Sequence, residues 1–137
     1  MRTLLLDSAL RLQIEREART AYPRECCGLM EGVRDGDTLR VVALHGTRNV
    51  AVDASEFEID GEDHFRLLRA ARENATHIVG CYHSHPEGIV APSARDRAGA
   101  NEEDFVWLIA SLTASAVAEL RVFVWRAGKF EALAIES

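Results

Sequence analysis

Two segments of this 137-residue chain carry apolar residues at helical spacing. The first stripe has apolar spacings of three and four and predicts a helix over residues 8–21, with Asp7 as its cap and Tyr22-Pro23 as its end. The second predicts a helix over 60–74, whose stripe comprises Phe65, Leu68 and Ala71 or Arg72. A third and shorter helix is expected to begin at Ser93.

Six apolar stretches between these helices predict strands. Most are rich in β-branched or aromatic residues and are bounded by Gly, Pro, Asp or Asn. The expected strands cover residues 26–33, 39–44, 77–83, 105–112, 120–125 and 129–135. A turn at 34–37 joins the first two into a hairpin, and residues 46–59 have an irregular pattern that becomes strand-like near Phe57. We expect one α/β domain over residues 1–137, with a mixed, mostly antiparallel sheet of about six strands flanked by two longer helices and one short helix.

Composition excludes several classes of partner. Sixteen basic and 22 acidic residues give a net charge of −6 without a basic run, so nucleic acid is not expected as a partner. The longest apolar run, 105–110, is far shorter than a membrane span, and the N-terminus lacks a signal-peptide pattern. Three cysteines without a Cys-x-x-Cys spacing indicate a reducing compartment. We therefore expect a cytoplasmic protein that binds no membrane.

Two histidines and an aspartate lie within fourteen residues and suggest a metal site. His83 and His85 occupy positions i and i+2 of a predicted strand, so their rings project to the same face. Pro86 ends that strand, and the chain then loops to a Ser93-x-x-Asp96 pattern at a helix start, where both side chains can share a face. Two imidazoles and one carboxylate with an open fourth position are typical of catalytic zinc, although the same donors also suit non-haem iron.

Other interpretations of these residues are less favourable. Ser93 and Asp96 taken alone would predict only a helix cap. Cys81 shares the face of the two histidines, but its short side chain starts about 13 Å from His85 along the strand, which favours a packed thiol. The remaining histidines lack partners in the sequence: His45, His64 and His77.

The motif resembles the JAMM, or MPN-plus, zinc metallopeptidases. Their signature is His-x-His-Pro, with seven residues between the second His and the Ser of Ser-x-x-Asp, and His83, His85, Ser93 and Asp96 reproduce it. The segment 23–29, Pro-Arg-Glu-Cys-Cys-Gly-Leu, also looks like the bacterial members of the family. The order of elements agrees from near residue 4 to the end of the chain.

The resemblance implies a role for each residue of the motif. His83, His85 and Asp96 would hold Zn²⁺, Glu25 would act as the general acid/base, and the Ser93 hydroxyl would stabilise the oxyanion. The residues alone do not select Glu25, since Glu31 and Glu87 are also candidates for the acid/base role.

The resemblance also implies a class of substrate. Family members cut peptide or isopeptide bonds near the C-terminus of ubiquitin-like proteins. Only 41 residues follow Asp96, so the chain looks like the compact bacterial members associated with ubiquitin-like sulfur carrier proteins. It carries no fused Cys-protease-like domain, which counts against the phage-tail and cell-wall members.

Two other functions compete with the metallopeptidase. One is a non-catalytic interaction module of the same fold, although such members have usually lost metal ligands that this chain retains. The other is a cysteine hydrolase that uses Cys26 or Cys27, for which the sequence supplies no paired base. The oligomeric state is not predicted by the sequence.

Overall fold

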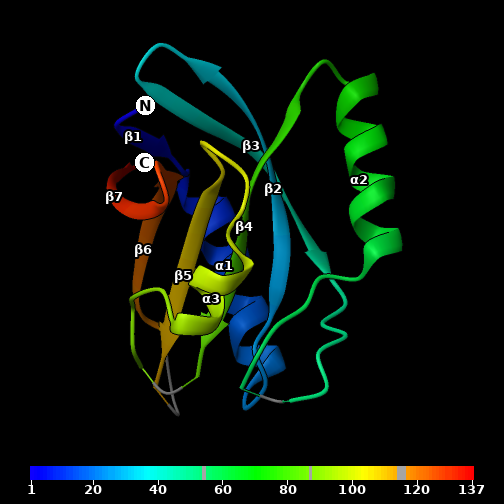
Figure 1. Ribbon diagram of the computed structural model, residues 1–137, viewed down its shortest axis with the longest axis vertical. Helices are drawn as coiled ribbons and strands as arrows, with labels where there is room; N and C mark the ends of the chain where they lie inside the picture. Colours follow the sequence, from blue (N-terminus) through cyan, green and yellow to red (C-terminus); the bar gives the residue numbers. More distant parts are fainter. Residues whose placement is uncertain (54, 87, 114–116) are drawn as a thin grey trace.

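Seven strands close into a barrel, and three helices lie against it (Figure 1). This computed structural model describes residues 1–53, 55–86, 88–113 and 117–137. The strands are β1 (Thr3–Leu5), β2 (Cys27–Asp35), β3 (Thr38–Thr47), β4 (His77–His85), β5 (Val106–Leu112), β6 (Val117–Arg126) and β7 (Lys129–Glu136). The helices are α1 (Ser8–Ala21), α2 (Gly61–Glu73) and α3 (Ala94–Gly99).

The closed barrel corrects the predicted open sheet of about six flanked strands. Around the barrel the order is β1-β3-β2-β4-β5-β6-β7, and β1 pairs in parallel with both β3 and β7. Leu4 therefore lies opposite both Leu39 and Ile135. The sequence pattern missed β1 because three residues are too few for a period to appear. Closure was missed with it, because that strand completes the ring.

Helix α1 has the predicted bounds and cap. The Asp7 carboxylate accepts a hydrogen bond from the Leu10 amide at 2.9 Å, which satisfies one of the free donors of the first turn. Ile14 and Ala18 are buried where the helix packs against β3, β5 and β6. The C-terminal end of α1 leads directly to the short segment that carries Glu25.

Helix α2 packs on β2, β3 and β4, but the predicted buried stripe is partly wrong. Leu67 and Ala71, one turn apart, face the sheet, whereas Phe65 and Leu68 are 63% and 42% exposed. The spacing of the apolar residues predicted the helix correctly. It did not determine which face is buried, because two overlapping apolar stripes are present. None of the helices in the described part of the chain is long and apolar enough to cross a membrane.

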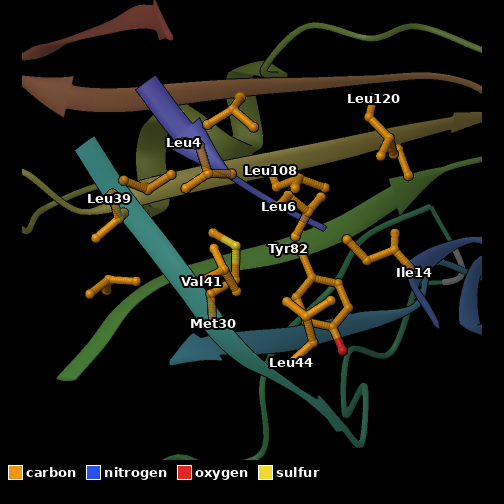
Figure 2. Packing of buried hydrophobic residues seen from close by; sticks show 14 of the residues in the cluster. Leu4, Leu6, Ile14, Met30, Leu39, Val41, Leu44, Tyr82, Leu108 and Leu120 are labelled. Atoms are coloured by element: carbon orange, nitrogen blue, oxygen red, sulfur yellow. The ribbon is translucent and has the colours of Figure 1, made fainter. Parts of the chain in front are cut away.

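The two faces of β4 separate the barrel core from the candidate site. Tyr82 points into the main core together with leucines and valines of the surrounding strands (Figure 2). Cys81 belongs instead to a smaller cluster beneath α2, with Leu29, Leu67 and Trp107. His83, two residues further on, shares the face of Cys81 and contacts Trp107. The site therefore lies outside the barrel, at the C-terminal end of β4.

Candidate metal centre

His83 and His85 are alternate residues at the C-terminal end of β4, so both side chains project from the same face of the strand. Their Nε2 atoms lie 3.0 Å apart, and His83 is completely buried. Ser84 points to the opposite face, where its Oγ accepts a hydrogen bond from the Cys26 amide at 2.8 Å. This bond fastens the segment before β2 to the strand that carries both histidines.

Asp96 reaches the histidines from the first turn of α3. Its Oδ2 atom accepts a hydrogen bond from the Ser93 amide at 2.9 Å, and Ser93 Oγ accepts one from the Asp96 amide at 3.0 Å. These two bonds form a capping box, so the helix-cap interpretation is correct. The same Oδ2 atom lies 3.2 Å from His83 Nε2 and 3.4 Å from His85 Nε2. The cap thus positions the carboxylate beside both rings.

The three converging atoms fit the donor set of a zinc ion. Their separations of 3.0, 3.2 and 3.4 Å are close to the roughly 3.3 Å expected between tetrahedral ligands with bonds of about 2.0–2.1 Å. His85 Nδ1 lies 2.6 Å from the carbonyl oxygen of Ile89, which can only accept a hydrogen bond. In the neutral ring Nδ1 therefore carries the proton, which leaves the Nε2 lone pair available to a metal ion.

The His83 ring is held differently. Its Nδ1 atom is buried and has no hydrogen-bond partner among the described residues. The ring stacks on Phe57 with centroids 4.2 Å apart, and Trp107 meets it edge-on at 6.1 Å. Packing between two aromatic side chains, rather than a second hydrogen bond, sets the orientation of this ring.

Glu25 lies beside the two histidines and is also buried. Donor atoms of Glu25, His83 and His85 fall within 4.8 Å of one another, which makes Glu25 part of the same cluster. Burial raises the pKa of Glu25 to about 7, opposed by His85 and reinforced by the charges of Asp96 and Glu56. A carboxyl group with a pKa near neutrality can both accept and release a proton at physiological pH.

The electrostatics of the other three residues are coupled. Burial disfavours ionisation of Asp96, but the two histidines outweigh it and hold the pKa of that carboxyl well below its usual range. Burial lowers the pKa of His83, opposed by Asp96. Burial also disfavours the charged form of His85, yet Asp96 and the Ile89 carbonyl raise its pKa overall. An anionic Asp96 beside a neutral His83 is the protonation state that a divalent cation requires.

A cleft of about 610 Å³ opens over this cluster. Its lining includes Asp53 and Ser55 together with residues of the segment that precedes α3. The described residues that line it are Pro23, Glu25, Asp53, Ser55, His85, Pro86, Ile89, Ala91, Pro92 and Ser93. Glu25 and Ser93, the two residues to which the resemblance assigns chemistry, therefore face one solvent-accessible space.

The remaining candidates lie elsewhere. The Glu31 carboxylate is bound by His45 at 2.8 Å and by Thr76 at 2.5 Å, away from the histidine pair. Glu87 lies outside the described residues. Among the described residues, none of His45, His64 and His77 belongs to the cluster.

The cysteines do not form a nucleophilic site. All three thiols are free and buried. Burial raises the pKa of Cys26 to about 12, and it also raises the pKa values of Cys27 and Cys81. A thiol whose pKa lies far above neutrality is a poor nucleophile, so this geometry disfavours a cysteine hydrolase.

Two supporting residues were missed by the sequence analysis. Phe57 stacks on His83, and Asn49 contacts the backbone of Glu25. Asn49 lies in the stretch with an irregular pattern, and Phe57 lies in the part of it that is strand-like in sequence. Their contacts join residues 24 to 26 positions apart, and a single sequence carries no local signal for such a pairing.

The chain is similar to several characterised proteins. It is 40% identical over 90 residues to the desampylase of Haloferax volcanii, a match that covers 65% of this chain and 63% of that protein. It is 32% identical over 85 residues to the desampylase of Pyrococcus furiosus, covering 62% and 58%. A match of 33% identity over 95 residues to tail tip assembly protein K of Escherichia phage N15 covers 69% of this chain but 35% of that protein. The matched part thus spans less than two thirds of each relative.

A solved structure agrees with the whole fold. The solution structure of protein DSY2949 from Desulfitobacterium hafniense superposes with a TM-score of 0.82 at 26% identity, covering 98% of this chain and 91% of that one. The family described as prokaryotic homologs of the JAB domain matches residues 7–127, from the cap of α1 to the turn before β7. The resemblance drawn from the His-x-His and Ser-x-x-Asp motifs is thereby confirmed, and the chain belongs to this family of prokaryotic JAB-domain proteins.

Proposed function

We propose that this protein is a zinc-dependent peptidase or isopeptidase that hydrolyses an amide bond near the C-terminus of a ubiquitin-like protein. The observation that carries the proposal is the convergence of His83 Nε2, His85 Nε2 and Asp96 Oδ2 within 3.0–3.4 Å, beside a cleft that His85 lines. The desampylase names of two relatives support an isopeptidase that removes a ubiquitin-like modifier. More specifically, we propose that the substrate is a sulfur carrier protein with a C-terminal extension.

His83, His85 and Asp96 would hold the zinc. When bound, zinc supplies Lewis acidity that polarises a carbonyl group and makes water a stronger nucleophile. Glu25 accepts the proton of the attacking water and transfers it to the departing amine, for which a pKa near 7 is suited. Because Glu25 is buried and lines the cleft, its carboxylate can approach the scissile bond with little competition from bulk water.

Ser93 would stabilise the oxyanion of the tetrahedral intermediate. Its Oγ lone pair already accepts the Asp96 amide, which leaves the hydroxyl hydrogen free to donate toward the cleft. One such donor is typically worth roughly 3–4 kcal/mol of transition-state stabilisation. Ser93, the cap residue of α3, would therefore have two roles: it holds Asp96 in place and it stabilises the oxyanion.

The test is incubation of the purified protein with two substrates: a sulfur carrier protein extended at its C-terminus, and a lysine conjugate of the same protein. Intact-mass spectrometry should detect loss of the extension or the conjugate, a chelator should abolish the reaction, and added zinc should restore it. Zinc-loaded protein that leaves both substrates intact would favour the non-catalytic interaction module. Cleavage that a chelator does not affect would contradict the metal-dependent mechanism.

A further inference from the structure

A segment between β3 and α2 lies beside Glu25. We call residues 49–53 and 55–58 the strap. In Figure 1 the strap follows β3 and returns toward the turn between α1 and β2. Its ends are joined by an Asn49–Ile59 bridge and by a hydrogen bond from the Val50 amide to the Glu58 carbonyl at 2.9 Å. The two described parts of the strap are therefore joined at its base.

The strap contacts three parts of the candidate site. Phe57 stacks on His83, and the Glu56 carboxylate pairs with Arg95 of α3 at 3.1 Å. Asn49 donates a hydrogen bond from Nδ2 to the Glu25 carbonyl oxygen at 3.0 Å. One segment thus touches His83, the helix of Asp96 and the proposed acid/base residue.

The Asn49 side chain uses its full hydrogen-bonding capacity. Nδ2 donates to the carbonyl oxygens of Glu25 and Glu56, and Oδ1 accepts from the amides of Ala51 and Glu58, each at 3.0 Å. An amide group has two donor hydrogens and two acceptor lone pairs, and all four are engaged. Because the two donors face carbonyls and the acceptor faces amides, the orientation of the amide is unambiguous.

Glu25 depends on such backbone support. Among the described residues, no hydrogen bond to its carboxylate is found, and the residue precedes the first residue of β2, Cys27. The sheet ladder therefore does not hold it. Its backbone is fixed by Asn49 on one side and by the bond from the next amide, that of Cys26, to Ser84 on the other. Arg24 adds a third contact, from its guanidinium to the Ala51 carbonyl at 2.9 Å.

We infer that Asn49 is a positioning residue, which fixes the backbone of Glu25 and joins it to the strap. The inference rests on the proposed function, because that function assigns Glu25 the role of general acid/base. Catalytic groups must be held to within a fraction of an ångström, and a misplacement of about 1 Å can cost roughly a hundredfold in rate. The Asn49 side chain does not need to touch the substrate for this role.

Two variants and a matched control test the inference. Asn49→Ala removes all four bonds, and Asn49→Asp removes the two donors while it retains an acceptor for Ala51 and Glu58. We expect kcat to fall by about 10- to 100-fold in both variants, with KM changed less than about threefold and zinc stoichiometry unchanged. Asp7→Ala, which removes the cap of α1 far from Glu25 in sequence, supplies a destabilised control whose kcat should stay within about twofold of the wild-type value.

The pattern of kcat decides whether the role is positional or merely structural. A reduction in Asn49→Ala no larger than that in Asp7→Ala, at equal loss of melting temperature, would overturn the inference. A parallel loss of zinc from both Asn49 variants would also overturn it, because the effect would then lie on the metal ligands and not on Glu25.

A measurement on the wild-type protein requires neither substrate nor variant. The side-chain amide hydrogens of Asn49 should exchange with solvent much more slowly, by NMR, than those of the exposed Asn101. Equal exchange rates would overturn the proposed contact, even if the variants fail to fold. Slow exchange in a protein that cleaves no substrate would instead locate the failure in the proposed function.

Discussion

His85 Nδ1 lies 2.6 Å from the carbonyl oxygen of Ile89, and this contact directs the other ring nitrogen toward Asp96. The loop between β4 and α3 therefore sets the tautomer of one proposed ligand, while the capping box of α3 positions another. Local backbone structure on both sides of the loop prepares the two donors before any ion binds.

The first prediction concerns the metal. His83→Ala, His85→Ala and Asp96→Ala should each weaken zinc binding by more than about a hundredfold, because a proposed ligand is lost outright and changes to mere supporting residues already cost about 10- to 100-fold. Zinc titration with a competing chelator measures the affinity. His64→Ala, which removes a histidine outside the cluster, should bind zinc normally. Wild-type affinity in Asp96→Ala would remove that residue from the ligand set.

The second prediction concerns catalysis by Glu25. Glu25→Gln preserves the shape of the side chain but removes the proton acceptor, so kcat should fall by about 10²- to 10⁴-fold while zinc remains bound. Turnover should be followed in the same preparation in which the zinc content is measured. Undiminished turnover in a zinc-loaded Glu25→Gln protein would exclude Glu25 from the mechanism.

The third prediction concerns pH and the stability of the metal-free protein. The pKa of Glu25 is raised from 4.5 to about 7, chiefly by burial, so the folded state binds the proton more tightly than the unfolded state. Its effect on folding is most favourable below about pH 4.5 and is lost as the pH rises through 7. Glu25→Gln, which cannot ionise, should therefore be more stable than wild type at pH 8 by about 1–3 kcal/mol, with a smaller difference near pH 4.5.

Urea unfolding of both metal-free proteins at the two pH values measures this difference. Glu73→Gln removes an exposed carboxyl at the end of α2 and controls for the change in net charge. A stability difference between Glu25→Gln and wild type that is the same at pH 4.5 and pH 8 would contradict a raised pKa at Glu25.

The fourth prediction concerns the packing beneath the site. A Cβ atom at Gly28 would lie 2.3 Å from Cζ of Tyr82 and 2.5 Å from the backbone oxygen of His45. Gly28→Ala should lower the free energy of unfolding by about 1–3 kcal/mol, because the barrel wall leaves no room for a methyl group. Gly61→Ala, where the new methyl group meets nothing within 4 Å, should be neutral or slightly stabilising in the same thermal melts. Equal stability of the two variants would contradict the packing.

The sequence predicted local elements more accurately than their assembly. Helix α1 begins and ends where its stripe and cap predicted, and the six expected strands all form, with shifted ends. The closed barrel was missed because it depends on β1, whose three residues pair with strands some 35 and 131 positions away. Such pairings are decided by the tertiary fold and leave no period in the sequence.

The same distinction applies to the candidate site. His83 and His85 were placed on one face by strand alternation, and Asp96 by helix spacing, so local geometry was enough. Glu25 required the family resemblance, since nothing near it in sequence points to the histidines. Neither approach identified Asn49 and Phe57, because their roles depend on tertiary contacts with Glu25 and His83.

The account depends most on a single ion held by three named atoms. Anomalous diffraction at the zinc edge, from crystals of the zinc-loaded wild-type protein, tests it most directly. The account predicts one peak at about 2.0–2.1 Å from His83 Nε2, His85 Nε2 and an Asp96 carboxylate oxygen. No peak at this position, or a peak bound by other residues, would contradict it.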